Sequence, residues 1–336
     1  MAGKQTIVVI GATGAQGGGV VDGLLKANKF VVKGVTRNID SPAAQKLAAE
    51  GVIVVKADLG DKASLLQAFQ GADGVFIVTD FFGGAKNDPA VEIRHGTNAV
   101  DAAKEANVKH AVLSTLEDPT EVVPKGAYRE AMPDLIVPHF QTKAAIAEHL
   151  RQSGVPHTLL LTSFFFENFS NGPYLKYLDG SYGYISNLKP DAAVPAHAVG
   201  DIGATAAVIF SNPSKYVGKT VPVAYERFKL PDALQIISDV TGKRFKYVHL
   251  SDKQFWSLPF PGGLAKDLSN MFRYYGEFTE HVVRLRDPAN SVYKGPTLRE
   301  WAQAHKDRLA NPPSVGMLGT LFLTTWVWIS SLVFGS

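Results

Sequence analysis

The stretch Thr6 to Gly17 reads TIVVIGATGAQG and decides the fold of this chain. Its first half is a run of β-branched residues, which predicts a strand covered on both faces. Its second half places Gly11, Gly14 and Gly17 three residues apart, directly before a helical pattern. A strand, a glycine-rich turn and a helix in this order predict a dinucleotide site, with the helix N-terminus facing the phosphates. The alternative is an ordinary tight turn.

The same alternation of strand and helix continues over the first half of the chain. Short Val- and Ile-rich runs predict six strands, over Thr6 to Ile10, Phe30 to Thr36, Val52 to Lys56, Gly74 to Thr79, Ala111 to Ser114 and His157 to Leu161. Apolar residues three and four apart predict crossover helices, over Ala43 to Glu50, Lys62 to Gln70 and Val91 to Ala106. The expected fold is α/β, a Rossmann-type doubly wound parallel sheet.

Beyond about residue 165 the alternation gives way to sequence rich in Pro, Gly and Tyr. Isolated helical patterns remain, over Asp201 to Phe210, Pro231 to Thr241 and Leu264 to Tyr275. We therefore expect a nucleotide-binding domain over residues 1–165, which the last strand and parts of the later chain also join. A smaller α+β lobe over residues 166–310 is expected to close over the carboxyl edge of the sheet.

The end of the second strand indicates which dinucleotide binds. NAD-specific sites place Asp or Glu there to hold the ribose 2′-hydroxyl, whereas this chain has Arg37 and Asn38. A guanidinium makes paired, charge-assisted hydrogen bonds to phosphate. The sequence therefore predicts NADP(H) as the cofactor, with Arg37 at the 2′-phosphate. A solvated surface position is the alternative for Arg37.

Two further strand ends carry polar residues. Asp58 and Leu59 follow the third strand, where a carboxylate can accept a hydrogen bond from the adenine amino group. Thr79, Asp80 and Phe81 end the fourth strand, beside the expected path of the nicotinamide. Asp and Thr are also favoured as helix N-caps, so both interpretations stay open.

Several segments together resemble one family. They read TIVVIGATGAQGG, VTRN, ADL, FIVTDFF, HFQTK, FFFENFS and NMFRYYGEF. In this order, between Gln5 and Lys306, they are similar to the NmrA-like family of atypical short-chain dehydrogenases. The similarity is to the subgroup that holds animal NADPH sensors and fungal oxidoreductases of secondary metabolism.

The resemblance implies a position for each candidate cofactor-binding residue. Those expected at the pyrophosphate are Gly11, Ala12, Thr13, Gly14, Ala15 and Gln16, with Gly17 packing the helix. Arg37 would lie at the 2′-phosphate, and Asp58 and Leu59 near adenine. Those expected around the ribose and nicotinamide are Thr79, Asp80, Phe81, Lys143, Glu167, Asn168, Phe169 and Ser170.

The segment His139 to Lys143 departs from ordinary short-chain dehydrogenases. Those enzymes use a Tyr four residues before the Lys, and here His139 occupies the Tyr position. Either His139, or Lys143 if burial favours its neutral form, would act as acid or base. Ser114, at the end of the fifth strand, would orient the substrate. Alternatively, Lys143 only hydrogen-bonds the nicotinamide ribose, His139 packs one turn away, and Ser114 is an ordinary strand-end serine.

An aromatic cluster follows the sixth predicted strand. It comprises Phe164, Phe165, Phe166, Tyr174, Tyr177, Tyr182 and Tyr184. Such a cluster predicts either the wall of an apolar substrate pocket or ordinary core packing.

Composition excludes several classes of function. The formal net charge is only +3 over 336 residues, and Lys and Arg are dispersed, so nucleic acid is not an expected partner. The chain has no Cys, which rules out disulfides and thiolate chemistry. Its nine His show no paired-ligand spacing, so we expect no metal site. The N-terminus lacks a signal-peptide pattern, and we expect a cytoplasmic protein.

The end of the chain is a separate case. Met317 to Phe334 is apolar and contains no charged residue, which approaches the roughly 20 residues that cross a bilayer as a helix. Residues 315–336 are therefore a candidate membrane anchor that would leave the preceding domains in the cytosol. A tail docked on the lobe is the alternative.

The sequence thus predicts an NADP(H)-dependent oxidoreductase of the NmrA-like type. Its expected substrate is a small apolar metabolite, such as a secondary metabolite, with a carbonyl, imine or conjugated double bond to reduce. The alternative is a non-catalytic NADP(H) redox sensor that regulates a protein partner, such as a transcription regulator.

Overall fold

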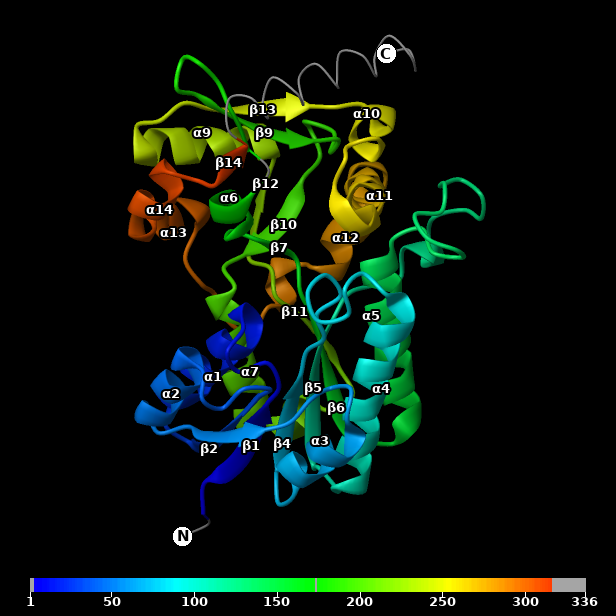
Figure 1. The fold of residues 1–336 in the computed structure, drawn as a ribbon, viewed down its shortest axis with the longest axis vertical. Helices are drawn as coiled ribbons and strands as arrows, with labels where there is room; N and C mark the ends of the chain where they lie inside the picture. The colour runs from blue at the N-terminus through cyan, green and yellow to red at the C-terminus, as the bar shows by residue number, and fades with distance from the viewer. Residues whose placement is uncertain (1–2, 173, 316–336) are drawn as a thin grey trace.

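A computed structural model describes residues 3–172 and 174–315 (Figure 1). The lower part of the molecule in Figure 1 is a sheet with helices on both faces, and the upper part is a lobe of short strands and helices. The candidate membrane anchor, apart from Val315, lies outside the described residues. No helix within the described part of the chain is long and apolar enough to span a bilayer.

The sheet has seven strands, and every neighbouring pair is parallel. They are β1 (Gln5–Val9), β2 (Phe30–Thr36), β3 (Ile53–Lys56), β4 (Gly74–Ile77), β5 (His110–Thr115), β6 (His157–Leu161) and β11 (Thr220–Pro222). Their order, β11-β6-β5-β4-β1-β2-β3, is that of a Rossmann sheet. The predicted fold class is confirmed, and the six predicted strands are all present, with bounds shifted by at most two residues.

Helices cover both faces of the sheet (Figure 1). They are α1 (Ala15–Ala27), α2 (Pro42–Ala49), α3 (Lys62–Phe69), α4 (Pro89–Glu105), α5 (Pro138–Ser153) and α7 (Gly200–Ser211). Successive side chains from Ile7 to Ile10 point to opposite faces of the sheet and show which helices cover each face. Ile7 and Val9 pack in one core with α1 and α7, while Val8 and Ile10 pack in a second core with α3, α4 and α5. Two buried faces explain why the strands are almost continuously apolar.

The chain returns to the sheet after it has entered the lobe. Helix α7 packs on α1, and β11 adds a seventh strand beside β6. The contact between α1 and α7 depends on three glycines. A Cβ on Gly203 would lie 1.8 Å from the carbonyl oxygen of Gly19, and a Cβ on Gly23 would lie 2.3 Å from the carbonyl carbon of Gly203. The two helix backbones therefore touch directly.

The lobe is built around two small sheets. Strands β7 (Phe164–Phe165), β10 (Val194–His197) and β12 (Glu226–Phe228) form one, and β8 (Tyr174–Lys176), β9 (Tyr182–Ser186), β13 (Phe245–His249) and β14 (Ser314–Val315) form the other. The lobe helices are α6 (Asn168–Asn171), α9 (Leu230–Thr241), α10 (Asp252–Trp256), α11 (Leu264–Glu277), α12 (Thr279–Leu285), α13 (Leu298–Ala304) and α14 (Lys306–Ala310). Helix α8 (Pro213–Tyr216) and three 3₁₀ turns, Pro119–Glu121, Pro261–Gly263 and Pro288–Asn290, complete the described elements.

A buried ion pair joins the lobe to the sheet. Arg286, directly after α12, donates through Nη1 to Oε1 of Glu117 at 2.8 Å, and its Nη2 pairs with the other carboxylate oxygen. Its Nε donates to the carbonyl oxygen of Thr162 at 2.7 Å. Glu117 follows β5 and Thr162 follows β6. The guanidinium therefore fixes the lobe on the carboxyl edge of the sheet, where sequence analysis expects it.

The glycine contact between α1 and α7 can be tested by substitution. We expect Gly203→Ala to lower the free energy of unfolding by about 1–3 kcal/mol or more, because the added methyl group overlaps the backbone of α1. Gly200→Ala on the same helix is the matched control, since a Cβ there meets nothing within 4 Å. Urea denaturation of both variants measures the difference. Equal stability of the two variants would show that the helices do not approach this closely.

Candidate functional site

A cavity of about 950 Å³ lies between the carboxyl ends of the sheet strands and the lobe. Most of the predicted site residues line it: Gly11, Thr13, Gly14, Ala15, Gln16, Gly17, Arg37, Asn38, Asp58, Leu59, Thr79, Asp80, Phe81, Ser114, His139, Lys143 and Asn168. Ala12, Glu167, Phe169 and Ser170 do not. One cavity therefore joins the glycine turn to the segment around His139 and Lys143.

The glycine turn leaves the N-terminus of α1 open to the cavity. Gly14 is the N-cap, has no side chain to accept from the first amides, and is followed by no acidic residue in the first turn. Gly11 has φ +65°, and a Cβ on Gly17 would lie 2.1 Å from the carbonyl oxygen of Gly11. Free amides and the positive end of the helix dipole favour an anion at this point. Ala12 is buried behind the turn, with its amide bonded to Val35.

Arg37 provides a cation at the same end of the cavity. Its side chain is exposed and makes no hydrogen bond or ion pair with any residue that the structure describes. Asn38 shapes the turn that follows, because its side-chain oxygen accepts from the amide of Asp40 at 3.0 Å. The guanidinium is therefore available to a ligand phosphate.

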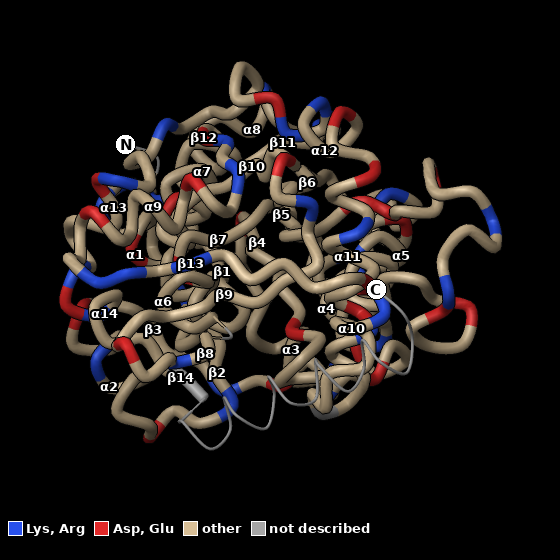
Figure 2. Tube along the Cα trace, turned by 90° about the horizontal axis from the view of Figure 1, so that it is seen from above, with Lys and Arg blue, Asp and Glu red and all other residues tan. Residues whose placement is uncertain are grey.

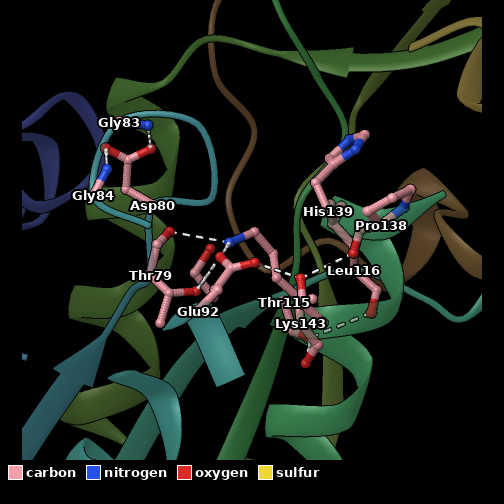
Figure 3. Close-up of polar contacts among 12 residues, drawn as sticks. Thr79, Asp80, Gly83, Gly84, Glu92, Thr115, Leu116, Pro138, His139 and Lys143 are labelled. Atoms are coloured by element: carbon pink, nitrogen blue, oxygen red, sulfur yellow. Dashed lines mark hydrogen bonds and ion pairs between the residues drawn. The ribbon is translucent and has the colours of Figure 1, made fainter. Parts of the chain in front are cut away.

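Asp58 and Asp80 are not helix N-caps. Helix α3 is capped by Asp61 and α4 by Asp88. Asp58 instead accepts from the amide of Gly60 at 2.6 Å, at the wall of the cavity. Asp80 accepts from the amides of Gly83 and Gly84, both at 2.9 Å, and so shapes the loop after β4 (Figure 3).

Lys143 binds a buried carboxylate that sequence analysis did not identify. Its Nζ lies 2.6 Å from Oε1 of Glu92 and 3.0 Å from both the carbonyl and the hydroxyl oxygen of Thr79 (Figure 3). Glu92 is fully buried on α4 and also accepts from the hydroxyls of Thr79 and Thr142. Nζ of Lys143 is therefore held by three oxygen atoms, an arrangement suited to a group that binds and orients a ligand.

His139 also binds a buried carboxylate, and this one comes from the lobe. Its Nδ1 lies 2.7 Å from both oxygens of Asp267, which is on lobe helix α11. Both side chains are buried, with 7% of His139 and 1% of Asp267 exposed. Sequence analysis did not identify Asp267, because nothing near it in the chain marks an interaction with His139.

Ser114 lies between the two ends of the cavity. Its hydroxyl donates to the side-chain oxygen of Gln16 at 2.7 Å, which connects β5 to the first turn of α1. This hydrogen bond gives Ser114 a more specific environment than that of an unpartnered strand-end serine.

The family resemblance places residues 167–170 around the ribose and nicotinamide. Helix α6, which contains most of them, divides them between the cavity and the core. Asn168 and Asn171, three residues apart, line the cavity. Phe169 and Ser170 are fully buried on the other face of the helix. Glu167 accepts from the amide of Val199 at 3.0 Å and stabilises the backbone before α7. The helical period therefore separates residues that are adjacent in sequence.

The aromatic cluster is divided in the same way. Phe164, Phe165 and Tyr184 line the cavity, and Phe164 and Tyr184 also belong to the lobe core. Phe166, Tyr174, Tyr177 and Tyr182 belong to or pack against that core and do not line the cavity. The rest of the lobe wall, which sequence analysis missed, consists of Phe255, Leu268, Met271, Phe272 and Tyr275. These five residues make one end of the cavity strongly apolar.

Charged residues of both signs are spread over the described part of the chain. Figure 2 shows Lys and Arg interspersed with Asp and Glu around the molecule. Among residues 3–172 and 174–315, no group of three or more His, Asp and Glu is arranged to hold a metal ion.

A family model described as the NmrA-like family matches residues 3–301. An NmrA-like family domain-containing protein of Dictyostelium discoideum is 30% identical over 287 residues, which are 82% of this chain and 88% of that protein. An NmrA-like family domain-containing oxidoreductase of Aspergillus campestris is 28% identical over 314 residues, covering 87% of this chain and 88% of the relative.

Solved structures share the fold. NmrA, described as a negative transcriptional regulator, aligns with a TM-score of 0.73 at 22% identity and covers 89% of this chain and 95% of its own. The triphenylmethane reductase of Citrobacter sp., solved with NADP(H), aligns with a TM-score of 0.67 at 21% identity and covers 89% of this chain and 99% of its own. At these identities the likeness shows the fold alone.

The cluster around Glu92 predicts a stability effect. We expect Glu92→Gln to lower the free energy of unfolding by about 1–3 kcal/mol, because the ammonium of Lys143 loses its carboxylate partner in a site with little water. Adding Lys143→Met should restore part of this loss, since it removes the unpaired charge. Urea denaturation measures both changes.

The matched control is Glu148→Gln, which breaks the exposed ion pair with Arg151 on α5. It should leave the unfolding curve unchanged. A Glu92→Gln variant as stable as this control would contradict the buried ion pair.

Proposed function

The chain belongs to the NmrA-like family, as its sequence predicts, and we propose that it is an NADP(H)-dependent oxidoreductase. One observation carries the proposal: a single cavity holds an uncapped helix N-terminus and a free Arg37 at one end, and His139 and Lys143 at the other. We propose that it reduces a carbonyl, imine or conjugated double bond of a small apolar metabolite. The name of the Aspergillus campestris relative supports this class of reaction.

The nucleotide end fits a dinucleotide with an extra phosphate. The amides after Gly14 would bind the pyrophosphate, and Gly11 and Gly17 allow the backbone to pack closely enough for that. Arg37 would bind the 2′-phosphate, while Asp58 and Leu59 border the adenine position. The NADP(H) in the Citrobacter reductase structure supports this choice of cofactor. When bound, the nicotinamide supplies a hydride.

The reaction end fits an apolar substrate. Its wall contains Phe255, Met271, Phe272 and Tyr275, side chains that exclude water and favour a hydrophobic or aromatic ligand. In our proposal Lys143 orients the ribose from its position on Glu92, and Ser114 orients the substrate. His139 exchanges the proton at this end, because its second ring nitrogen makes no hydrogen bond with the described residues.

A non-catalytic sensor is the second candidate function. The ion pair between Lys143 and Glu92 supports it, because an ammonium already bound by a buried carboxylate is suited to hold a nucleotide without proton transfer. The structure of NmrA, described as a negative transcriptional regulator, supports it as well. A protein partner would then respond to the bound nucleotide.

The assignment of the 2′-phosphate to Arg37 predicts a change in cofactor preference. We expect Arg37→Gln to weaken NADPH binding by about 10-fold to 100-fold, the equivalent of one charged hydrogen-bonding group, and to leave NADH binding unchanged. Arg244→Gln, at an exposed arginine of the lobe, is the control. Fluorescence titration of both nucleotides provides the measurement. An equal loss of affinity for NADPH and NADH would show that Arg37 does not bind the 2′-phosphate.

Cofactor consumption separates the two functions. We expect the purified protein to oxidise NADPH in the presence of at least one member of a panel of apolar ketones, quinones, enones and cyclic imines. The loss of absorbance at 340 nm and the identified reduced product measure turnover. Tight NADPH binding with no oxidation across the panel would support the sensor and reject the reductase.

A further inference from the structure

We infer that Asp267 is a positioning residue that orients His139 so that its Nε2 gives a proton to an uncharged hydride acceptor. The inference rests on the proposed oxidoreductase function and names the acceptor class. His139 would be the catalytic residue, since it lines the cavity. Asp267 would act through it, from a helix of the other lobe.

The contact between the two side chains defines which ring nitrogen is free. Both carboxylate oxygens of Asp267 lie 2.7 Å from Nδ1 of His139. A carboxylate only accepts, so Nδ1 carries a hydrogen and donates it. Nε2 has no partner among the described residues and belongs to a side chain that lines the cavity. The free nitrogen is therefore the one that can meet a substrate.

Aromatic rings hold the imidazole in this orientation. The ring of Phe140 stands edge-on to it at 4.7 Å between centroids, and the rings of Phe82 and Phe81 lie at 5.2 and 6.4 Å. These three contacts and the carboxylate leave the ring little freedom to turn. An acid held in one orientation loses little entropy when it meets its substrate.

The groups near His139 leave one ring nitrogen open to a substrate. Asp267 contacts Nδ1, and Nε2 has no partner among the described residues. Lys143 lies one helical turn away, but its ammonium points in a different direction, toward Thr79 and Glu92 (Figure 3). Lys143 is thus paired with Glu92, and the carboxylate that contacts His139 is that of Asp267.

The proton balance then defines the acceptor. A carbonyl, quinone or enone that gains a hydride at carbon becomes an alkoxide or an enolate, and one proton makes it neutral. Imidazolium supplies that proton from Nε2, becomes neutral imidazole and is reprotonated by solvent. An iminium cation becomes a neutral amine on gaining hydride and needs no proton. A neutral imine that gains a hydride needs one proton as a carbonyl does, so a proton donor at this position fits any uncharged acceptor and does not serve an iminium cation.

Other histidines do not share this arrangement. His149, which like His139 lies on α5, is 2.8 Å from Oδ1 of Asp101 on α4. Both side chains are 38% exposed, and neither residue lines the cavity. His95 lines the cavity and has no described hydrogen bond to a carboxylate. Among the histidines that the structure describes, His139 alone combines the cavity with a buried carboxylate. Asp101 therefore offers a matched control.

The first test uses the protein without nucleotide. In ¹⁵N spectra of the imidazole side chains we expect Nδ1 of His139 to be protonated in the neutral ring of the unsubstituted protein. Asp267→Leu removes the described acceptor of Nδ1, so the proton should no longer be confined to Nδ1. Asp101→Leu should alter His149 and leave His139 unchanged. An Nδ1 that lacks a proton in the unsubstituted protein, or holds it unchanged in Asp267→Leu, would overturn the orienting role.

The second test measures turnover with the best uncharged acceptor of the panel. We expect Asp267→Asn to lower kcat by about 100-fold or more, the usual contribution of general acid catalysis, with the KM for NADPH unchanged. His139→Gln should lose a similar factor, and the double variant should be no slower than either single one, because the two residues act as a unit. Asp101→Asn should match the unsubstituted protein.

The outcomes separate the inference from the proposed function. Turnover that survives Asp267→Asn, or a kcat loss accompanied by weaker NADPH binding, would overturn the positioning role and leave the oxidoreductase intact. Absence of turnover in the unsubstituted protein would reject the oxidoreductase. The spectra of the nucleotide-free protein would still decide whether Asp267 orients His139.

Discussion

The cavity exists because a buried ion pair holds the lobe on the sheet. Arg286 and Glu117 are both removed from water, and separating them would leave a charge without a partner in a poorly polar interior. Burial lowers the pKa of Arg286, but the Glu117 carboxylate together with Tyr275 and Tyr274 raises it above its ordinary value, so the guanidinium stays protonated. Because α12 follows α11 directly, the pair that fixes α12 also fixes the helix that carries Asp267 and the apolar wall.

Helix α5 connects the two sides of this cavity. His139 and Lys143 are four residues apart, so both lie on one face, yet each has a different partner. Lys143 is bound to Glu92 of α4 on the sheet side, and His139 is bound to Asp267 of the lobe. One helix thus presents a fixed ammonium and a fixed imidazole to the same volume. The proposed nucleotide end, in contrast, is formed by the turn between β1 and α1 and by residues that follow β2 and β3.

The sequence could predict what depends on neighbours in the chain. Two-sided burial gives the strands their apolar runs, and the glycine turn marks the start of α1, so the fold and the place of that turn were predictable. The partners of Lys143, His139 and Arg286 were not, because they are 51, 128 and 169 residues away. In the sequence each is an ordinary acidic residue. A later strand was expected to join the sheet, but its position at β11 was not predicted, since three residues that include a proline give no periodic signal.

The replacement of Tyr by His139 has a structural consequence that follows from these distances. In the short-chain dehydrogenases that the chain resembles, the tyrosine and the lysine share one helix, so proton chemistry needs a single element. Here the group that contacts the imidazole comes from the lobe, which Arg286 and the hydrogen bonds of Asn270 hold against the sheet domain. The proposed nucleotide contacts and the proposed proton transfer therefore depend on different parts of the molecule. A change in α11 can alter the reaction while the glycine turn and Arg37 stay as they are, which is why an oxidoreductase and a sensor can share one nucleotide site.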